Sequence, residues 1–388
     1  MEQFEFYNPV RVVFGKDVID KLGEAISDMG RKVFLVYGMG SIKKIGVYDK
    51  VIKILEDESK KVSEHGGVKA NPVLSHAREG IEKVRKDRAD FILAVGGGSV
   101  IDEAKAIAAG ALYKGDVWDF YAGKAEIEEA MPIVVVSTLP ATGSEMNGGT
   151  VLTNDETDDK FGLISEPLHP VCTFMDPQVT YSIPKDYTAY AGVDAISHCI
   201  EGYFTHTTPW APVQERYIEG LVKAIMESIE AILEKPDDYY ARAAFMWAAS
   251  LAWNGLTAAG LEGAGVPSHM LAHPLSGLYN LAHGATLAIT IPAWMRWSLG
   301  EGNSRLEGFA RNVMGVTKRN PQKAAEDGIE AVKEWFTKIG CPVTLKDADI
   351  PEGDIDRIAE KAYDLAVVWQ LDKAYPKELI KQIFSYAL

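Results

Sequence analysis

The chain has 388 residues, of which 47% are hydrophobic and 24% are charged, a composition typical of a globular protein with room for two domains. A net charge of -15 repels phosphate backbones and anionic lipid, so neither nucleic acid nor a membrane surface is an expected partner. The three cysteines, Cys172, Cys199 and Cys341, are too few and too scattered for a disulfide framework, which favours a reducing compartment.

The N-terminal residues 1–5 have neither the basic region nor the apolar core of a signal peptide. The apolar run Leu287–Trp294 contains Pro292 and is far shorter than the ~20 residues that a spanning helix needs. We therefore expect no membrane span, a cytoplasmic location, and a place in the core for this run.

The first half of the chain alternates β-rich runs with helical patterns. Buried strands are predicted over Val33–Tyr37, Phe91–Val95 and Ile133–Ser137, and helices over Val47–Lys61, Ser75–Asp87 and Ser99–Ala111. This order of strand, turn, helix and strand is typical of a doubly wound, mostly parallel sheet.

The pattern changes after Ser182-Ile183-Pro184, beyond which no strand is expected. Helices are predicted over Tyr187–Tyr203, Val213–Leu233, Tyr239–Leu261, Met270–Leu281, Arg305–Val313, Ala324–Ile339 and Asp354–Val367. We therefore predict an α/β N-terminal dinucleotide-binding domain over residues 1–180 and an all-α C-terminal domain over residues 181–388. The third of these helices carries Trp247, Trp253 and Leu256, which suggest an apolar pocket wall.

Histidines gather in the C-terminal half. Asp194 and His198 are four residues apart, so on a helix they share a face and can bind one ion together. His269 and His273 repeat this spacing, and His283 follows a short turn. One carboxylate with several imidazoles suits a borderline divalent cation such as iron(II), zinc or manganese. Packing histidines are the alternative, and spacing alone leaves open which histidine lies outside the coordination sphere.

Three successive glycines mark an expected phosphate site. A predicted strand runs into Gly96-Gly97-Gly98, where the backbone can approach a pyrophosphate closely. Ser99 is predicted to N-cap the following helix, with Asp102 completing a capping box. The alternative is a tight strand–helix turn that binds nothing.

Two further turns follow predicted strands. The first carries Gly38, where dinucleotide sites often place an acid that binds the ribose hydroxyls, and Lys43 and Lys44 follow. The missing acid and the lysines favour a 2′-phosphate, so NADPH is expected. The second turn, residues 137–147, is rich in small hydroxyl side chains that can bond the nicotinamide side, and it lacks the Gly-x-Ser-x-Gly pattern of serine hydrolases. Because these turns and the histidines lie in different halves, we expect the chemistry in a cleft between the domains.

Together these features resemble the iron-containing (group III) alcohol dehydrogenases, especially the branch of NADPH-dependent aldehyde reductases and butanol dehydrogenases. The likeness covers nearly the whole chain and rests on the segments Asn8–Lys16, Asn71-Pro72, Gly96–Asp102, Thr138–Glu145, Gly192–Ala195 and His283-Gly284. It implies the fold that these enzymes share with dehydroquinate synthase, which is an α/β dinucleotide-binding domain followed by a helical domain.

The resemblance also implies roles for individual residues. The implied metal ligands are Asp194, His198, His269 and His283, with iron(II) the expected ion and zinc the alternative. His273 matches a residue beside the metal and nicotinamide that is not a ligand, and it is a candidate proton relay or positioning group. Coenzyme contacts are implied at Gly38, Ser41, Asn71, Gly97, Gly98, Ser99, Thr138, Thr142, Asn147 and Lys160, and the capping residue Asp102 is added to this set. NADP is favoured by Gly38, with NAD as the alternative, and a homodimer is expected in which Phe4–Phe14 pairs across the interface.

The expected function is reversible hydride transfer between a nicotinamide and a small aliphatic alcohol or aldehyde such as butanol or butanal, with the metal as Lewis acid. The alternatives are a dehydroquinate synthase-like or glycerol dehydrogenase-like enzyme on the same fold, or a non-catalytic nucleotide- or metal-binding protein. A lyase with a polyanionic substrate needs basic residues near the metal, and Asp194–Tyr203 and Val266–Ile291 contain neither Lys nor Arg.

Overall fold

The computed structural model describes residues 1–388, and the chain forms two units that each draw on separated segments. The α/β unit contains Tyr7–Ile183 and Pro236–Ser250, and the helical unit contains Met1–Phe6, Pro184–Lys235 and Leu251–Leu388. The main passage from one unit to the other lies close to residue 180, where the sequence pattern changes. Met1–Phe6 packs with the helical unit and Pro236–Ser250 packs with the α/β unit, although each lies among residues of the other unit in sequence.

A six-stranded parallel sheet organises the α/β unit, with strand order β1-β8-β5-β4-β2-β3. Its strands are β1 (Arg11–Phe14), β2 (Lys32–Gly38), β3 (Lys61–Val68), β4 (Phe91–Gly97), β5 (Ile133–Leu139) and β8 (Cys172–Met175). The predicted strands are β2, β4 and β5, which are neighbours in the sheet and bury most of their residues. Strands β1, β3 and β8 were not predicted, because β3 is a polar edge strand and β1 and β8 are only four residues long, so none of them forms a long continuous apolar run. The antiparallel hairpin of β6 (Gly149–Asn154) and β7 (Asp159–Ile164) was not predicted either.

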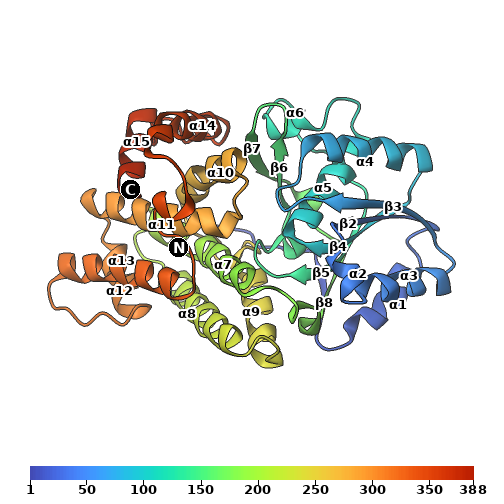
Figure 1. The fold of residues 1–388 in the computed structure, drawn as a ribbon, viewed down its shortest axis with the longest axis horizontal. Helices are drawn as coiled ribbons and strands as arrows, with labels where there is room; N and C mark the ends of the chain where they lie inside the picture. The colour runs from blue at the N-terminus through green and yellow to red at the C-terminus, as the bar shows by residue number, and fades with distance from the viewer. The chain divides into compact units, whose positions relative to one another are not determined.

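Helices cover both faces of the six-stranded sheet (Figure 1). The helices of this unit are α1 (Leu22–Ile26), α2 (Ser41–Lys44), α3 (Val47–Asp57), α4 (Leu74–Asp87), α5 (Gly98–Leu112), α6 (Trp118–Tyr121) and most of α9 (Tyr239–Ala252). On one face, alternate strand residues such as Leu35, Leu93 and Val136 pack with α1 to α3 in one continuous core. On the other face lie α4 and α5. This doubly wound arrangement brings the carboxyl ends of β2 to β5 to one edge, where the candidate coenzyme loops begin.

The helical unit contains no strand. Its helices are α7 (Lys185–Thr205), α8 (Pro212–Glu234), α10 (Pro267–Tyr279), α11 (His283–Gly300), α12 (Arg305–Asn312), α13 (Pro321–Lys338), α14 (Ile355–Val368) and α15 (Lys377–Ser385). The prediction that Leu287–Trp294 lies in the core is confirmed, but this run is part of the long helix α11, which continues through Pro292. A proline removes one helical hydrogen bond, and burial of the apolar residues around it offsets that loss.

Two predicted helix ends were wrong. The helix expected over Val47–Lys61 stops at Asp57, and Lys61 instead begins strand β3. The helix expected over Tyr239–Leu261 stops at Ala252, so Trp253 and Leu256 lie in the turn that follows. Gly255, which adopts a positive φ of 92°, lies in this turn, and that backbone conformation does not continue a right-handed helix.

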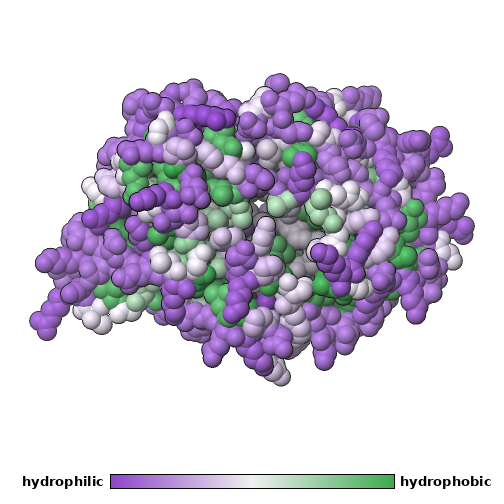
Figure 2. Space-filling view, viewed as in Figure 1, coloured by the Kyte–Doolittle hydropathy of each residue, from purple (hydrophilic) through white to green (hydrophobic).

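The predicted fold class, a parallel-sheet α/β domain followed by a helical domain, is confirmed. Figure 2 shows a face covered mainly by hydrophilic side chains with scattered apolar residues, as the composition leads us to expect. No helix combines the length and the hydropathy that a bilayer-spanning segment requires.

Candidate active site

Helix α7 carries the first pair of predicted metal ligands. Asp194 and His198 are both buried, and His198 Nε2 lies 3.8 Å from Asp194 Oδ1. The helix is rich in alanine and glycine and is buried on most sides, so these two polar groups face the protein interior rather than water. The i,i+4 spacing therefore places a carboxylate and an imidazole on one interior face, as predicted.

Helix α10 brings the next histidine to the same place. His269 Nε2 lies 3.0 Å from His198 Nε2 and 4.0 Å from Asp194 Oδ1. One donor atom from each of the three residues lies within 4.8 Å of the others. His198 and His269, which are 71 positions apart in the chain, thus meet because α10 and α7 pack within the helical unit.

The last two histidines lie beside this cluster. His283 is the first residue of α11, and its ring centroid is 5.1 Å from those of both His269 and His273. Gly284 lets α11 approach α7 this closely, because a Cβ there would collide with the backbone of Tyr190. The structure therefore places His283 and His273 beside the cluster of Asp194, His198 and His269, whose donor atoms lie within 4.8 Å of one another.

Glu201, which was not predicted from the sequence, is hydrogen-bonded to a histidine of the cluster. Its Oε2 accepts a hydrogen bond from Nδ1 of His269, and its Oε1 accepts from the backbone N–H groups of Ser268 and His269 at the start of α10. The carboxylate only accepts, so Nδ1 of His269 carries the proton and Nε2 keeps its lone pair. The available signal was that Glu201 follows His198 by three residues on the same helix, in reach of one face.

The geometry and charge of this cluster fit a divalent metal. Burial, and then the neighbouring His269 and His273, hold the pKa of His198 well below its usual range, which keeps the ring in the neutral form that a metal needs. Two Nε2 atoms 3.0 Å apart need a proton or a cation between them, since facing lone pairs repel. Donors that lie about 2.0–2.2 Å from a common ion are themselves roughly 3–3.5 Å apart, which is close to the spacing of these atoms.

Two tryptophans flank the histidines. The ring centroid of Trp253 is 4.9 Å from that of His198, and the centroid of Trp369 is 5.3 Å from that of His273. Trp247, also predicted for the pocket wall, instead packs against Phe14 in the α/β unit. The predicted wall of Trp247, Trp253 and Leu256 on one helix does not form, because α9 ends at Ala252 before Trp253.

The predicted coenzyme residues of the α/β unit gather at the carboxyl edge of the sheet. Gly38 ends β2, Asn71 follows β3, Gly97 and Gly98 join β4 to α5, and Thr138 lies near the end of β5. The remaining predicted contacts are Ser41 at the start of α2, Ser99 in the first turn of α5, Asp102 one turn further along α5, Thr142 and Asn147 in the loop after β5, and Lys160 in β7. Lys160 Nζ donates to Asn71 Oδ1 over 3.1 Å, which links the hairpin to the loop after β3.

The predicted capping box at α5 is wrong. The helix begins at Gly98 with Gly97 as its N-cap, and Ser99 donates its hydroxyl proton to the carbonyl of Ala70 instead. Asp102 accepts from Ser144 Oγ at 2.6 Å and from the backbone N–H of Val151 at 3.3 Å. The capping box failed because the glycine-rich turn leaves the first N–H groups of α5 open, which suits an anion better than a side-chain cap does.

A buried lysine holds the loop that carries two predicted coenzyme contacts. Lys105 is fully buried and donates to the carbonyl oxygens of Ser144, Asn147 and Gly149 over 2.7–2.8 Å. Burial lowers the pKa of Lys105 to about 8, and Asp102 opposes that shift. Burial likewise raises the pKa of Asp102 to about 6. Lys105 was not predicted, because nothing local distinguishes it from a surface lysine.

An α/β unit with a glycine-rich sheet edge and a helical unit with a carboxylate–imidazole cluster together define a class of nicotinamide-dependent metalloenzymes. The family pattern for iron-containing alcohol dehydrogenases matches residues 9–177, and the C-terminal pattern of the Fe-containing alcohol dehydrogenase family matches residues 188–388. The chain belongs to the iron-containing alcohol dehydrogenase family. The predicted family and the predicted enzyme class, an NAD(P)-dependent alcohol dehydrogenase, are therefore confirmed.

Individual relatives agree with this assignment. The chain is 37% identical over 390 residues to the probable NADH-dependent butanol dehydrogenase 1 of Bacillus subtilis, with 100% of both chains covered. It is 37% identical to the NADPH-dependent aldehyde reductase YqhD of Escherichia coli, with 93% of each chain covered. The crystal structure of NADH-dependent butanol dehydrogenase A from Thermotoga maritima superposes with a TM-score of 0.95 at 44% identity, covering 100% of this chain and 99% of that chain.

Proposed function

We propose that the protein catalyses reversible hydride transfer between NADPH and a small aliphatic aldehyde, with butanal as the test substrate. The observation that carries the proposal is the convergence of donor atoms from Asp194, His198 and His269 in a member of this family. The names of the relatives, butanol dehydrogenases and an aldehyde reductase, support the substrate class. Hydride transfer requires the coenzyme and the histidine cluster to face one substrate, and this stays a prediction.

The proposed metal ligands are Asp194, His198, His269 and His283. A divalent ion bound to them supplies Lewis-acid chemistry, which favours negative charge on the substrate oxygen. Iron(II) is the proposed ion, and zinc is the alternative because its intrinsic affinity for imidazole and carboxylate ligands is higher.

The protein's own groups prepare this site. Glu201 fixes the tautomer of His269, so that the Nε2 lone pair faces the donor cluster. His273 is the proposed group that exchanges a proton with the substrate oxygen through a ring nitrogen, and a positioning role is the alternative. Trp253 and Trp369 offer apolar ring surface on either side of the histidines, which favours an alkyl chain and excludes water.

The coenzyme preference rests on Gly38. A Cβ at this position would lie 3.5 Å from the carbonyl oxygen of Val68 and 3.6 Å from Val100 Cγ2, which are ordinary contacts. Packing therefore does not demand glycine here, and its presence leaves the site without a carboxylate that would repel a 2′-phosphate. NADH is the alternative, since the names of the relatives divide between the two coenzymes.

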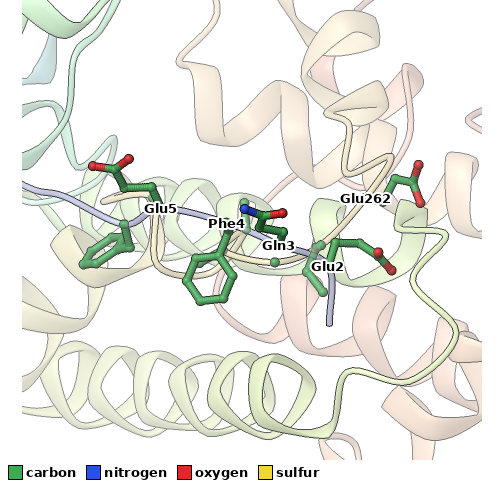
Figure 3. Close-up of a pocket in the computed structure, with 11 residues that line it drawn as sticks. Glu2, Gln3, Phe4, Glu5 and Glu262 are labelled. Atoms are coloured by element: carbon green, nitrogen blue, oxygen red, sulfur yellow. The ribbon is translucent and has the colours of Figure 1, made fainter.

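A homodimer is also proposed. Strand β1 lies at the edge of the sheet, and the side chains of Phe4, Phe6 and Tyr7 are exposed by 49%, 42% and 70%. In the helical unit, Glu2–Phe6 line a groove with Gly255 and Ala258–Glu262, and the side chain of Phe4 projects from the extended segment (Figure 3). Exposed aromatic side chains beside an open strand edge favour pairing with a second copy. Mass measurement in solution, with Tyr7→Asp as a variant that should weaken association, tests this proposal.

The compartment proposed is the reducing cytoplasm. All three cysteines are free and buried, which is what a reducing compartment leads us to expect.

The test of the catalytic proposal is the initial rate of butanal reduction with NADPH and with NADH. Each rate is measured on enzyme reconstituted with iron, on enzyme reconstituted with zinc, and on enzyme stripped of metal by a chelator. The proposal expects iron- or zinc-dependent turnover that His198→Ala abolishes together with metal binding, while His169→Asn, outside the cluster, leaves both unchanged. Turnover by metal-free enzyme would exclude the Lewis-acid role. Stoichiometric coenzyme and metal with no turnover on any aldehyde or glycerol would favour a non-catalytic binding protein. Activity on a polyanionic sugar acid would favour the dehydroquinate synthase-like alternative.

A further inference from the structure

A second cluster of metal-type donors lies in the α/β unit. His65 in β3, His76 in α4 and Glu103 in α5 each place one donor atom within 4.8 Å of the other two. His65 Nε2 lies 3.1 Å from Glu103 Oε1, and His76 Nδ1 lies 2.6 Å from the same oxygen. Three separate elements of the unit therefore meet at one carboxylate.

The carboxylate has a spare ligand atom. Glu103 is 0% exposed, and its second oxygen, Oε2, has no hydrogen-bond partner. A buried carboxylate is costly unless its charge is neutralised and its oxygens are satisfied. Both histidines approach Oε1, so they leave Oε2 without a partner. A cation bound beside Glu103 would neutralise its charge and would satisfy this second oxygen.

The arrangement of the two rings resembles that of the metal-type pair in the helical unit. The centroids of His65 and His76 are 4.0 Å apart with an interplanar angle of 25°, against 4.7 Å and 27° for His198 and His269. Gly80 leaves room at His65, since a Cβ there would come within 3.0 Å of its Nε2. The side chain of His76 is 22% exposed, which gives an ion a route from solvent.

We propose that His65, His76 and Glu103 bind one divalent ion of the zinc class, separate from the ion of the candidate active site. Two imidazoles and one carboxylate are a donor set that zinc uses in proteins. The ion joins β3, α4 and α5 and closes segment 66–75, which carries Asn71, so it stabilises the loop after β3.

The experiment separates the two sites by mutation. The background is the Asp194→Ala, His198→Ala double variant, in which the candidate active site has lost two donors. Zinc is titrated against a chromophoric chelator, cobalt(II) absorption reports the ligand field, and thermal unfolding reports stability. The expected result is one equivalent of zinc in the background, with a rise in Tm on zinc addition.

Matched variants assign the ligands. Adding His76→Asn or Glu103→Gln to the background is expected to weaken zinc binding at least about tenfold and to remove the zinc-dependent rise in Tm. His169→Asn in the same background, which removes a histidine outside both clusters, should change neither. Because the side chain of His76 is partly exposed, the His76→Asn variant is expected to fold, and an unchanged circular dichroism spectrum verifies this. The proposal is overturned if the background protein binds no zinc, or if the background and both ligand variants bind zinc with equal affinity. Either result is independent of the test of the catalytic proposal.

Discussion

Replacement of Glu201 by glutamine tests whether the histidine cluster is built for a metal or only packed. In the wild type, one oxygen of Glu201 accepts from Nδ1 of His269, and the other accepts from two backbone N–H groups at the start of α10. Glutamine offers one acceptor oxygen and one NH2 donor group. In Glu201→Gln, either the histidine ring or the helix terminus therefore faces a donor where it needs an acceptor.

The expected magnitude follows from burial. Loss of a group that orients a metal-binding histidine weakens metal affinity about 10- to 100-fold, which is about 1.4–2.8 kcal/mol at 1.4 kcal/mol per tenfold change. Glu201 is only 1% exposed, so water does not replace the lost acceptor. The unpaired N–H group lowers the free energy of unfolding by about 1–3 kcal/mol. Both metal affinity and Tm should fall, and saturating metal should restore most of kcat.

The assay is a competition titration against a chromophoric chelator, combined with thermal unfolding of the metal-free protein. Glu219→Gln is the matched control, because Glu219 is also buried and accepts from the side chains of Tyr203 and Asn312 but touches no histidine. The control should lower Tm and leave metal affinity unchanged. If Glu201→Gln behaves like the control, the cluster does not depend on Glu201 for metal binding and the reasoning fails.

Three further predictions concern the coenzyme, the packing of α11 and acid stability. Gly38→Asp adds a carboxylate that repels a 2′-phosphate, so the ratio of kcat/KM for NADPH to that for NADH should fall at least about tenfold, and an unchanged ratio would remove Gly38 from the coenzyme site. Gly284→Ala sets a methyl group against the backbone of Tyr190 and should lower the free energy of unfolding by about 1–3 kcal/mol, whereas Gly300→Ala, with open space at the end of the same helix, should not; equal values would contradict the close approach. Burial lowers the pKa of His206 from 6.5 to about 4. Between these pH values His206 is therefore protonated in the unfolded chain and neutral in the folded protein. Stability therefore falls as the pH drops through this range, and His206→Asn should flatten that fall in Tm, while parallel profiles would count against the assignment.

Local sequence patterns determined much of the architecture. Continuous apolar runs predicted β2, β4 and β5 because a strand that is covered on both faces buries every residue. The i,i+4 spacing predicted that Asp194 and His198 share one face of α7, since helical geometry alone fixes that relation. The same local reasoning predicted no helix over Leu287–Trp294, where α11 continues through Pro292 because burial of the surrounding helix outweighs one lost hydrogen bond. It failed at Ser99, whose hydroxyl donates to the carbonyl of Ala70 and does not cap the helix.

Tertiary structure alone decided which side chains share a site. His198, His269 and His283 come from three helices, and their meeting depends on how closely α11 packs on α7 at Gly284. The contact of Glu201 with His269, and those of Glu103 with His65 and His76, could not be predicted, because a carboxylate and a histidine on different elements have no fixed separation in sequence. Periodicity reports the direction in which a side chain leaves its own element, whereas the partner it meets depends on the packing of elements that are remote in the chain.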